Sequence, residues 1–246
     1  MTRLLAILAL LAFTTLPNVA AAETYNVYLG GMCSTGFQGG KGGGALLDLP
    51  GVEVEAFIDQ REDHHAAVIE FKNEILDRYC AGNDVCRLLG YSNGGAVISK
   101  ALSVYGPYNV MYALNSGSNE GGSELATTGW VAEIFGGCDL ADEIAPGDHR
   151  PAWNHHSTGG ATIYTVAGHS GFGAWYDPRR VTSGILPGED DGATSMASPY
   201  YSSSGGYDNG CGSGRWTSHH AAWWCSFDRD HYEIKMQGAK CLANGC

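Results

Sequence analysis

The sequence predicts an α/β fold in which a mostly parallel central sheet is flanked by helices. Strand-like apolar runs alternate along the chain with longer runs whose apolar residues recur at helical spacing. Parallel strands need crossover connections, which are usually helices, so this alternation indicates parallel βαβ units. A short glycine-rich turn, residues 90–94, also joins one strand-like run directly to a helix-like run.

The first elements lie before residue 81. Residues 24–31 (TYNVYLGG) are typical of a buried strand that ends in glycines, and residues 51–58 (GVEVEAFI) alternate between polar and apolar as a second strand does. Residues 64–80 carry apolar side chains at helical spacing, which predicts a helix with one buried face.

The middle of the chain repeats this order. Residues 84–91 (DVCRLLGY) predict another strand, and residues 94–106 predict a helix that a Gly-Pro pair ends. Residues 109–117 and 160–168 are apolar enough to be central strands.

Two long stretches do not fit this alternation. Residues 116–159 are rich in Gly, Ser and Asp, and a connection of that length in a compact domain is usually functional. Residues 198–226 are rich in Ser, Gly, Tyr and Trp and contain two cysteines, which suggests a disulfide-stapled surface excursion. Neither stretch has the composition of a linker, so we expect a single domain over 23–246 with 116–159 as an insertion or cap.

The N-terminus has the pattern of a secretory signal peptide. Met-Thr-Arg precedes an apolar run from Leu4 to Leu16, and small residues follow up to Ala22. The run is too short to span a bilayer comfortably, and no later stretch is a candidate span. We therefore expect residues 1–22 to be removed and the mature protein to be secreted, either outside the cell or into a periplasm.

The charge balance excludes nucleic acid as a partner. The whole chain carries a formal charge of −12, from 14 basic and 26 acidic residues. Loss of residues 1–22 removes only Arg3, which leaves 13 basic against 26 acidic residues and a charge of −13. Binding of phosphate backbones needs clustered Lys and Arg. No cofactor is expected.

The eight cysteines predict disulfides. An even number in an exported chain is typical of disulfide bonding, and the absence of Cys-x-x-Cys spacing argues against a zinc site. Eight cysteines allow 105 connectivities, of which proximity favours one set. Its pairs are Cys80 with Cys86, Cys211 with Cys225, Cys241 with Cys246, and the remaining Cys33 with Cys138.

Ser92 is the candidate nucleophile. It stands between Gly90 and Gly94, where a strand-like run ends and a helix-like run begins. The bare Gly-x-Ser-x-Gly pattern has little specificity in a chain with 36 glycines, and a plain glycine-rich turn is the alternative. The strand–turn–helix context favours a nucleophile elbow, where side chains at the two glycine positions would collide with the adjoining strand or helix.

"LGYSNGG" and "YNVYLGGMCSTGF" resemble motifs of the α/β-hydrolase superfamily, and within it of secreted bacterial lipases and esterases. The resemblance implies that the backbone amides of Met32 and Asn93 form an oxyanion hole. The chain has Gly30-Gly31 where that family has His-Gly, but the hole uses a backbone N–H, so the change need not remove it.

The same resemblance implies an acid and a histidine that follow the serine in the chain. "LPGEDDGATSMASPY" resembles the lipases' acid segment and indicates Asp191, with Asp190 as the alternative. "SFDRDHYEIK" places His231 in a late loop before the final helix, and His219 and His220 are the rival histidines.

The implied activity is hydrolysis of carboxylic esters through an acyl-enzyme, with an ester or lipid-like substrate. The apolar residues Trp130 and Phe135 lie in the otherwise polar insertion, and we expect them to cover the site and line an acyl pocket. Polyester or amide hydrolysis by the same triad is one alternative. A carbohydrate- or surface-binding module, favoured by the many Trp and Tyr residues, is another.

A metal site in the insertion is a further alternative, although scattered acidic residues and histidines in a long loop are more often only solvated. No EF-hand spacing supports calcium there. The residues concerned are Asp139, Asp142, Asp148, His149, His155 and His156.

Overall fold

The computed structural model describes residues 21–39, 44–128, 137–170, 186, 190, 191, 193, 210–213 and 221–244. Within these residues the strands form one seven-stranded sheet in the order β2-β1-β3-β4-β5-β7-β6. The strands are β1 (Thr24–Leu29), β2 (Val52–Ala56), β3 (Val85–Tyr91), β4 (Val110–Ser116), β5 (Thr162–Gly168), β6 (Gly210–Ser213) and β7 (Ala221–Phe227). Every neighbouring pair from β2 to β7 is parallel, and only the edge strand β6 is antiparallel. The predicted mostly parallel α/β sheet is confirmed.

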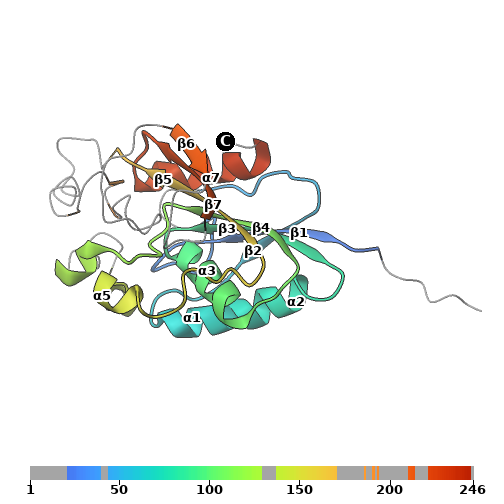
Figure 1. The fold of residues 1–246 in the computed structure, drawn as a ribbon, viewed down its shortest axis with the longest axis horizontal. Helices are drawn as coiled ribbons and strands as arrows, with labels where there is room; N and C mark the ends of the chain where they lie inside the picture. Colours follow the sequence, from blue (N-terminus) through green and yellow to red (C-terminus); the bar gives the residue numbers. More distant parts are fainter. Residues whose placement is uncertain are drawn as a thin grey trace, which may run out of the picture.

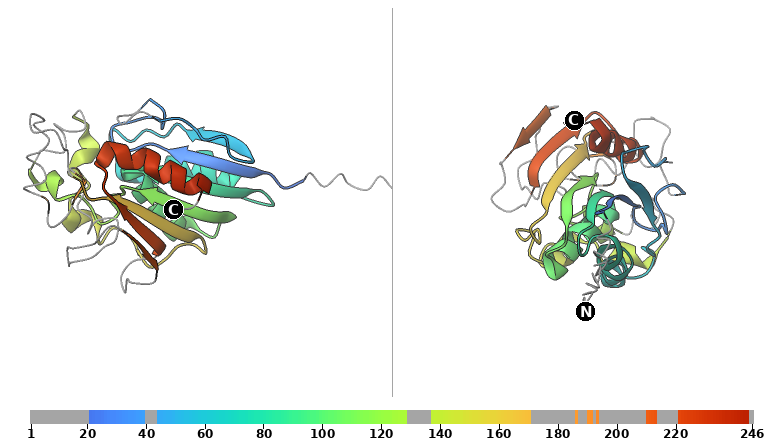
Figure 2. Two further views of the ribbon diagram at one scale, coloured as in Figure 1. Left: turned by 90° about the horizontal axis from the view of Figure 1, so that it is seen from above. Right: turned by 90° about the vertical axis from the view of Figure 1, so that its right-hand side faces the viewer.

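Helices cover both faces of this sheet (Figure 1). On one face lie α1 and α3, with α3 against β3 and β4, and on the other face α7 packs on β3, β4 and β5. Figure 2 shows α7 crossing the strands from a second direction. The described helical segments are α1 (His64–Phe71), the π-helical turn η1 (Lys72–Leu76), α2 (Asp77–Tyr79), α3 (Asn93–Tyr105), the 3₁₀ turns η2 (Glu124–Thr128) and η3 (Asp139–Asp142), α5 (Pro146–His149) and α7 (His231–Asn244).

The alternation of strand side chains explains the two layers. Val27 and Leu88 point to the core beneath α1 and α3, whereas their neighbours Tyr28 and Leu89 belong to the core beneath α7. Successive side chains of a strand face opposite sides of a sheet, so a strand buried on both faces is apolar throughout. This is why β1 and β3 are mostly apolar, with Asn26 and Arg87 as polar exceptions nearer their first residues.

One prediction for the C-terminal part is wrong. Residues 198–226 were expected to be a surface excursion, but Ala221–Phe227 is a sheet strand between β5 and β6. The strand pairs in parallel with β5 from Ile163 to Gly168, and its Cys225 is fully buried. Its aromatic residues follow a Gly- and Ser-rich stretch, which hid the strand pattern. His231, expected in a loop, is the first residue of α7.

Two of the predicted disulfides are present in the structure, Cys33–Cys138 and Cys80–Cys86. Cys225 and Cys241 are also disulfide-bonded. The β6–β7 register places Cys211 directly opposite Cys225, as the predicted pairing requires. The Cys211–Cys225 and Cys241–Cys246 bonds remain predictions, because the side chain of Cys211 and residue 246 lie outside the described part.

The predicted signal peptide, residues 1–22, falls almost entirely outside the described residues. Among the described helices, none is both long enough and apolar enough to cross a bilayer.

Candidate active site

Ser92 lies on a sharp turn between β3 and α3. Its φ of 54° and ψ of −127° fall in a region that residues with a side chain rarely adopt. The turn is held by the Ser92 backbone N–H, which donates to the carbonyl of Ser116 at the end of β4 (2.9 Å). Strain of this kind persists only where the surrounding structure enforces it, and it is common at functional sites.

The two flanking glycines are required by close backbone contacts. A Cβ on Gly90 would lie 2.6 Å from the backbone of Gly95 in α3, and a Cβ on Gly94 would lie 2.3 Å from the carbonyl oxygen of Gly30. Both separations are shorter than any non-bonded carbon contact tolerates. The predicted steric reason for the Gly-x-Ser-x-Gly spacing is therefore confirmed.

The structure brings Ser92, His231 and Asp191 together from three distant parts of the chain. Nε2 of His231 lies 3.0 Å from Oγ of Ser92, and Nδ1 lies 2.7 Å from Oδ2 of Asp191. All three residues are buried. With Nδ1 protonated and hydrogen-bonded to the carboxylate, Nε2 presents its lone pair to the serine hydroxyl. This arrangement can remove a proton from Ser92 and stabilise the imidazolium that results.

Asp191 is held in place through both its side chain and its backbone. Its Oδ1 accepts a hydrogen bond from the backbone N–H of Ala193 (3.0 Å), and its backbone oxygen accepts one from the N–H of His231 (2.7 Å). Gly168 makes room for it, since a Cβ there would lie 2.9 Å from Cβ of Asp191. Asp190 is buried too, but the carboxylate that contacts the imidazole belongs to Asp191.

Tyr91 also holds His231 and was not singled out in the sequence. Its hydroxyl donates to the backbone oxygen of His231 (2.9 Å), and the two rings lie 5.2 Å apart between centroids. Tyr91 directly precedes the nucleophile, so one short segment supports both members of the hydrogen-bonded pair.

The loop after β1 passes directly over Ser92. A Cβ on Gly31 would lie 2.8 Å from Cβ of Ser92, so only glycine allows this approach. Met32 follows in this loop, and Asn93 is the first residue of α3, where backbone amides have no acceptor within the helix. In the described part of the chain no backbone acceptor takes up either amide. Both predicted oxyanion residues are thus beside the serine.

A pocket of about 420 Å³ opens at Ser92. It is lined by the 31–36 loop together with Glu55, Arg61 and Lys235. Lys235 is almost fully buried beside the rings of Phe37 and Tyr91, and this burial lowers its pKa to about 8. Phe57, Tyr91 and Tyr232 also line the pocket, so its described wall combines aromatic with charged side chains.

Four other predicted or rival residues lie outside the described part of the chain, namely Trp130, Phe135, His219 and His220. His149 and His155, proposed above as alternative metal ligands, are buried against Trp153. Burial lowers the pKa of His149 to about 3. Among the described residues no three His, Cys, Asp or Glu side chains converge as a metal site would require.

The fold is that of the α/β-hydrolases, as solved structures show. The chain is similar to a Bacillus licheniformis lipase in its mature form, with a TM-score of 0.55, 18% identity and 87% of each chain covered. It is also similar to a metagenomic carboxyl esterase, with a TM-score of 0.59 and 12% identity over 91% of this chain and 76% of the esterase.

A third similar structure is phospholipase PlaB from Legionella pneumophila in complex with thio-NAD. Its TM-score is 0.53 at 14% identity, over 72% of this chain and 43% of the phospholipase. No family model matches the sequence. No curated protein matches it in sequence either.

The Cys33–Cys138 disulfide carries a testable consequence for the loop that supplies Met32. It spans 105 residues and ties this loop to the segment before η3. We expect the double substitution Cys33→Ser and Cys138→Ser to lower turnover by roughly tenfold, because small displacements of catalytic groups are costly. The thermal midpoint should also fall, since cross-links over long loops stabilise by up to about 4.7 kcal/mol. Ester hydrolysis, measured well below the midpoint, and thermal unfolding test both effects.

The matched control removes the other described disulfide through Cys80→Ala and Cys86→Ala. Cys86 lies near the start of β3, at the opposite end of that strand from Ser92. This variant should lose stability but keep its turnover. Equal losses of turnover in the two variants would contradict a specific role for Cys33–Cys138.

Proposed function

We propose that the protein is a secreted serine hydrolase that cleaves carboxylic esters through an acyl-enzyme. The observation that carries the proposal is the hydrogen-bonded series Ser92–His231–Asp191 on a strained strand-to-helix turn. The likeness to a lipase and a carboxyl esterase adds support at the level of the fold.

Each described residue has a chemical role in this proposal. Oγ of Ser92 attacks the ester carbonyl while Nε2 of His231 takes its proton. The carbonyl oxygen becomes an oxyanion that accepts hydrogen bonds from the amides of Met32 and Asn93. His231 then gives the proton to the departing alcohol, and the acyl group remains on Ser92.

Water completes the cycle by the same route. His231 removes a proton from the water as it attacks the acyl carbonyl, and returns it to Oγ of Ser92 as the acid leaves. Asp191 stays ionised throughout and stabilises the charged imidazole. The positive end of the α3 dipole adds to the stabilisation of negative charge near Asn93.

Export is the second part of the proposal. Residues 1–22 have the composition of a signal peptide. Among the described cysteine side chains none is free, and disulfides persist mainly in oxidising compartments. Sequencing of the N-terminus of the exported protein tests this part, and the first residue found should be Glu23.

The activity is tested with p-nitrophenyl esters of graded chain length and with a fluorophosphonate probe. We expect hydrolysis of at least the short esters and covalent labelling of Ser92, located by peptide mapping. The alternative of a carbohydrate- or surface-binding module predicts neither. A folded protein that is not labelled and hydrolyses no ester would remove the proposal.

A further inference from the structure

Gln60 is a fully buried polar residue that no motif in the sequence marks. It lies between β2 and α1, and its side chain is 0% exposed. Burial of an amide side chain is costly unless its donors and acceptors are used. Both ends of the Gln60 amide have partners, and those partners lie on the two segments that supply the oxyanion amides.

The side chain of Gln60 bridges these two segments. Its Nε2 donates to the carbonyl oxygen of Gly30 (2.6 Å), two residues before Met32. Its Oε1 accepts a hydrogen bond from Nδ2 of Asn93 (3.0 Å) at the start of α3. One planar amide therefore fixes the distance between the loop after β1 and the first turn of the helix.

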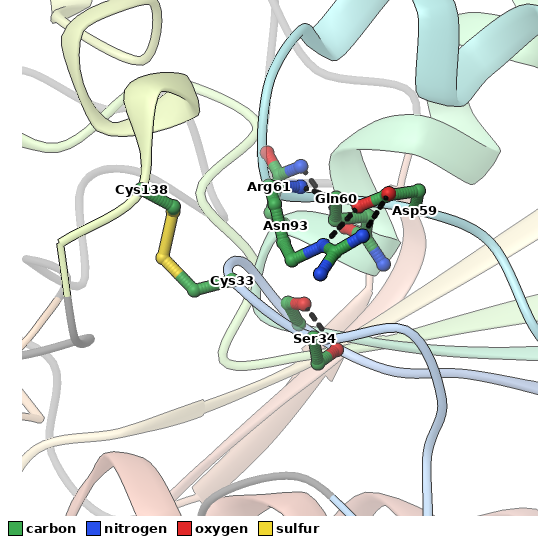
Figure 3. The surroundings of a disulfide bond; sticks show 8 residues. Cys33, Ser34, Asp59, Gln60, Arg61, Asn93 and Cys138 are labelled. Atoms are coloured by element: carbon green, nitrogen blue, oxygen red, sulfur yellow. Dashed lines mark hydrogen bonds and ion pairs between the residues drawn. A yellow bond between two sulfur atoms is a disulfide. The ribbon is translucent and has the colours of Figure 1, made fainter.

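The backbone of Gln60 holds the same loop beyond Met32. Its carbonyl oxygen accepts from the N–H of Cys33 (2.8 Å), and its N–H donates to the carbonyl oxygen of Ser34 (3.1 Å). Together with the Gly30 contact, these bonds fix the chain on both sides of Met32. Figure 3 shows Gln60 between Asn93 on one side and the Cys33–Ser34 segment on the other.

The neighbours of Gln60 are restrained as well. The guanidinium of Arg61 binds both carboxylate oxygens of Asp59 (2.8 and 2.6 Å), and the carbonyl of Arg61 accepts from the N–H of Leu140 (3.2 Å). Exposed ion pairs contribute little stability, so we assign the Arg61–Asp59 pair only a local ordering role. These contacts restrain the chain directly before and after Gln60.

We infer that Gln60 is a positioning residue, which sets the separation of the Met32 and Asn93 amides so that both reach one oxyanion. This inference rests on the proposed esterase function. A donor aligned only in the transition state accelerates turnover without tightening substrate binding. Loss of Gln60 should therefore appear in kcat and leave KM nearly unchanged.

The test compares Gln60→Leu and Gln60→Glu with the wild type on a short p-nitrophenyl ester. Removal of one oxyanion donor costs about 10²- to 10³-fold in other enzymes, so misalignment should lower kcat by roughly 10- to 100-fold. KM should stay within about threefold. Inhibition by a trifluoromethyl ketone, whose hemiketal on Ser92 carries an oxyanion, should weaken in parallel with kcat.

The Gln60→Glu variant adds a pH signature that a purely structural role would not give. When ionised, the introduced carboxylate can still accept from Asn93 but cannot donate to Gly30, and its negative charge opposes the oxyanion. When protonated it can do both, and burial favours the protonated form. The ratio of wild-type to variant kcat should therefore increase as the pH rises, whereas Gln60→Leu should show no such trend.

A loss of kcat could also come from a fraction of unfolded protein. To separate the two, the active sites are titrated to completion with the fluorophosphonate, and kcat is expressed per labelled serine. Gln237→Leu, a matched change on α7, should leave kcat unaltered. Unchanged kcat per site in both Gln60 variants, with wild-type inhibition by the ketone, would overturn the inference while the esterase proposal stands. A wild-type protein that hydrolyses no ester would instead remove the proposal beneath it.

Discussion

Ser92→Ala should abolish ester hydrolysis and leave the fold intact. Losses of about 10⁴-fold or more are expected when a nucleophile that acts as part of a triad is removed. The change deletes one oxygen whose described hydrogen bond is to Nε2 of His231. The backbone bond from Ser92 to Ser116, which holds the turn, does not involve the side chain. Steady-state kinetics with a short p-nitrophenyl ester and thermal unfolding measure the two effects separately.

The matched control is Ser103→Ala on the same helix. Ser103 lies near the end of α3, and its hydroxyl donates to the carbonyl of Asn154 (2.8 Å). This variant should keep wild-type turnover and react fully with the fluorophosphonate, which Ser92→Ala should not. A folded Ser92→Ala protein with activity near the wild-type level would falsify the assignment of the nucleophile.

Local sterics made the elbow predictable. A Cβ on Gly90 would collide with Gly95 in the following helix, and a Cβ on Gly94 would collide with the carbonyl oxygen of Gly30, which directly follows the neighbouring strand β1, so the spacing of the two glycines around Ser92 carries the information. Asp191 and His231 were identified through resemblance and chain order, because nothing local to either residue specifies its partner. The sheet then brings them together at the ends of its strands, where parallel α/β folds place their sites.

Other features left no signal in the sequence. Gln60 is separated by 30 residues from Gly30 and by 33 from Asn93, so its role exists only after the chain has folded. The strand β7 was missed for a similar reason. Its place in the sheet depends on pairing with β5, and residues 221–227 show no alternation of polar and apolar side chains that would indicate a strand. Long-range partners of single polar residues are the part of a site that pattern analysis misses.

His231→Ala and Asp191→Asn should both reduce turnover strongly, for different reasons. Without the imidazole no base accepts the proton of Ser92, so His231→Ala should lose about 10⁴-fold or more. In Asp191→Asn the new amide can donate to Nδ1, which favours the tautomer with the proton on Nε2. That tautomer cannot accept the serine proton, and a loss of about 10⁴-fold in kcat is expected.

The same chemistry sets the pH dependence and the controls. Protonated His231 has no lone pair for Ser92, so wild-type activity should fall as the solution is acidified. Oδ2 of Asp191 accepts the hydrogen bond of the Nδ1–H group, with 2.7 Å between the two heavy atoms, so Asp191 rather than Asp190 is the acid that should matter. Accordingly, Asp190→Asn should retain far more activity than Asp191→Asn, and His219→Ala and His220→Ala should remain active. If either of these two histidine variants were inactive while His231→Ala kept its turnover, the proton acceptor would have to be reassigned, even though Nε2 of His231 lies 3.0 Å from the serine hydroxyl.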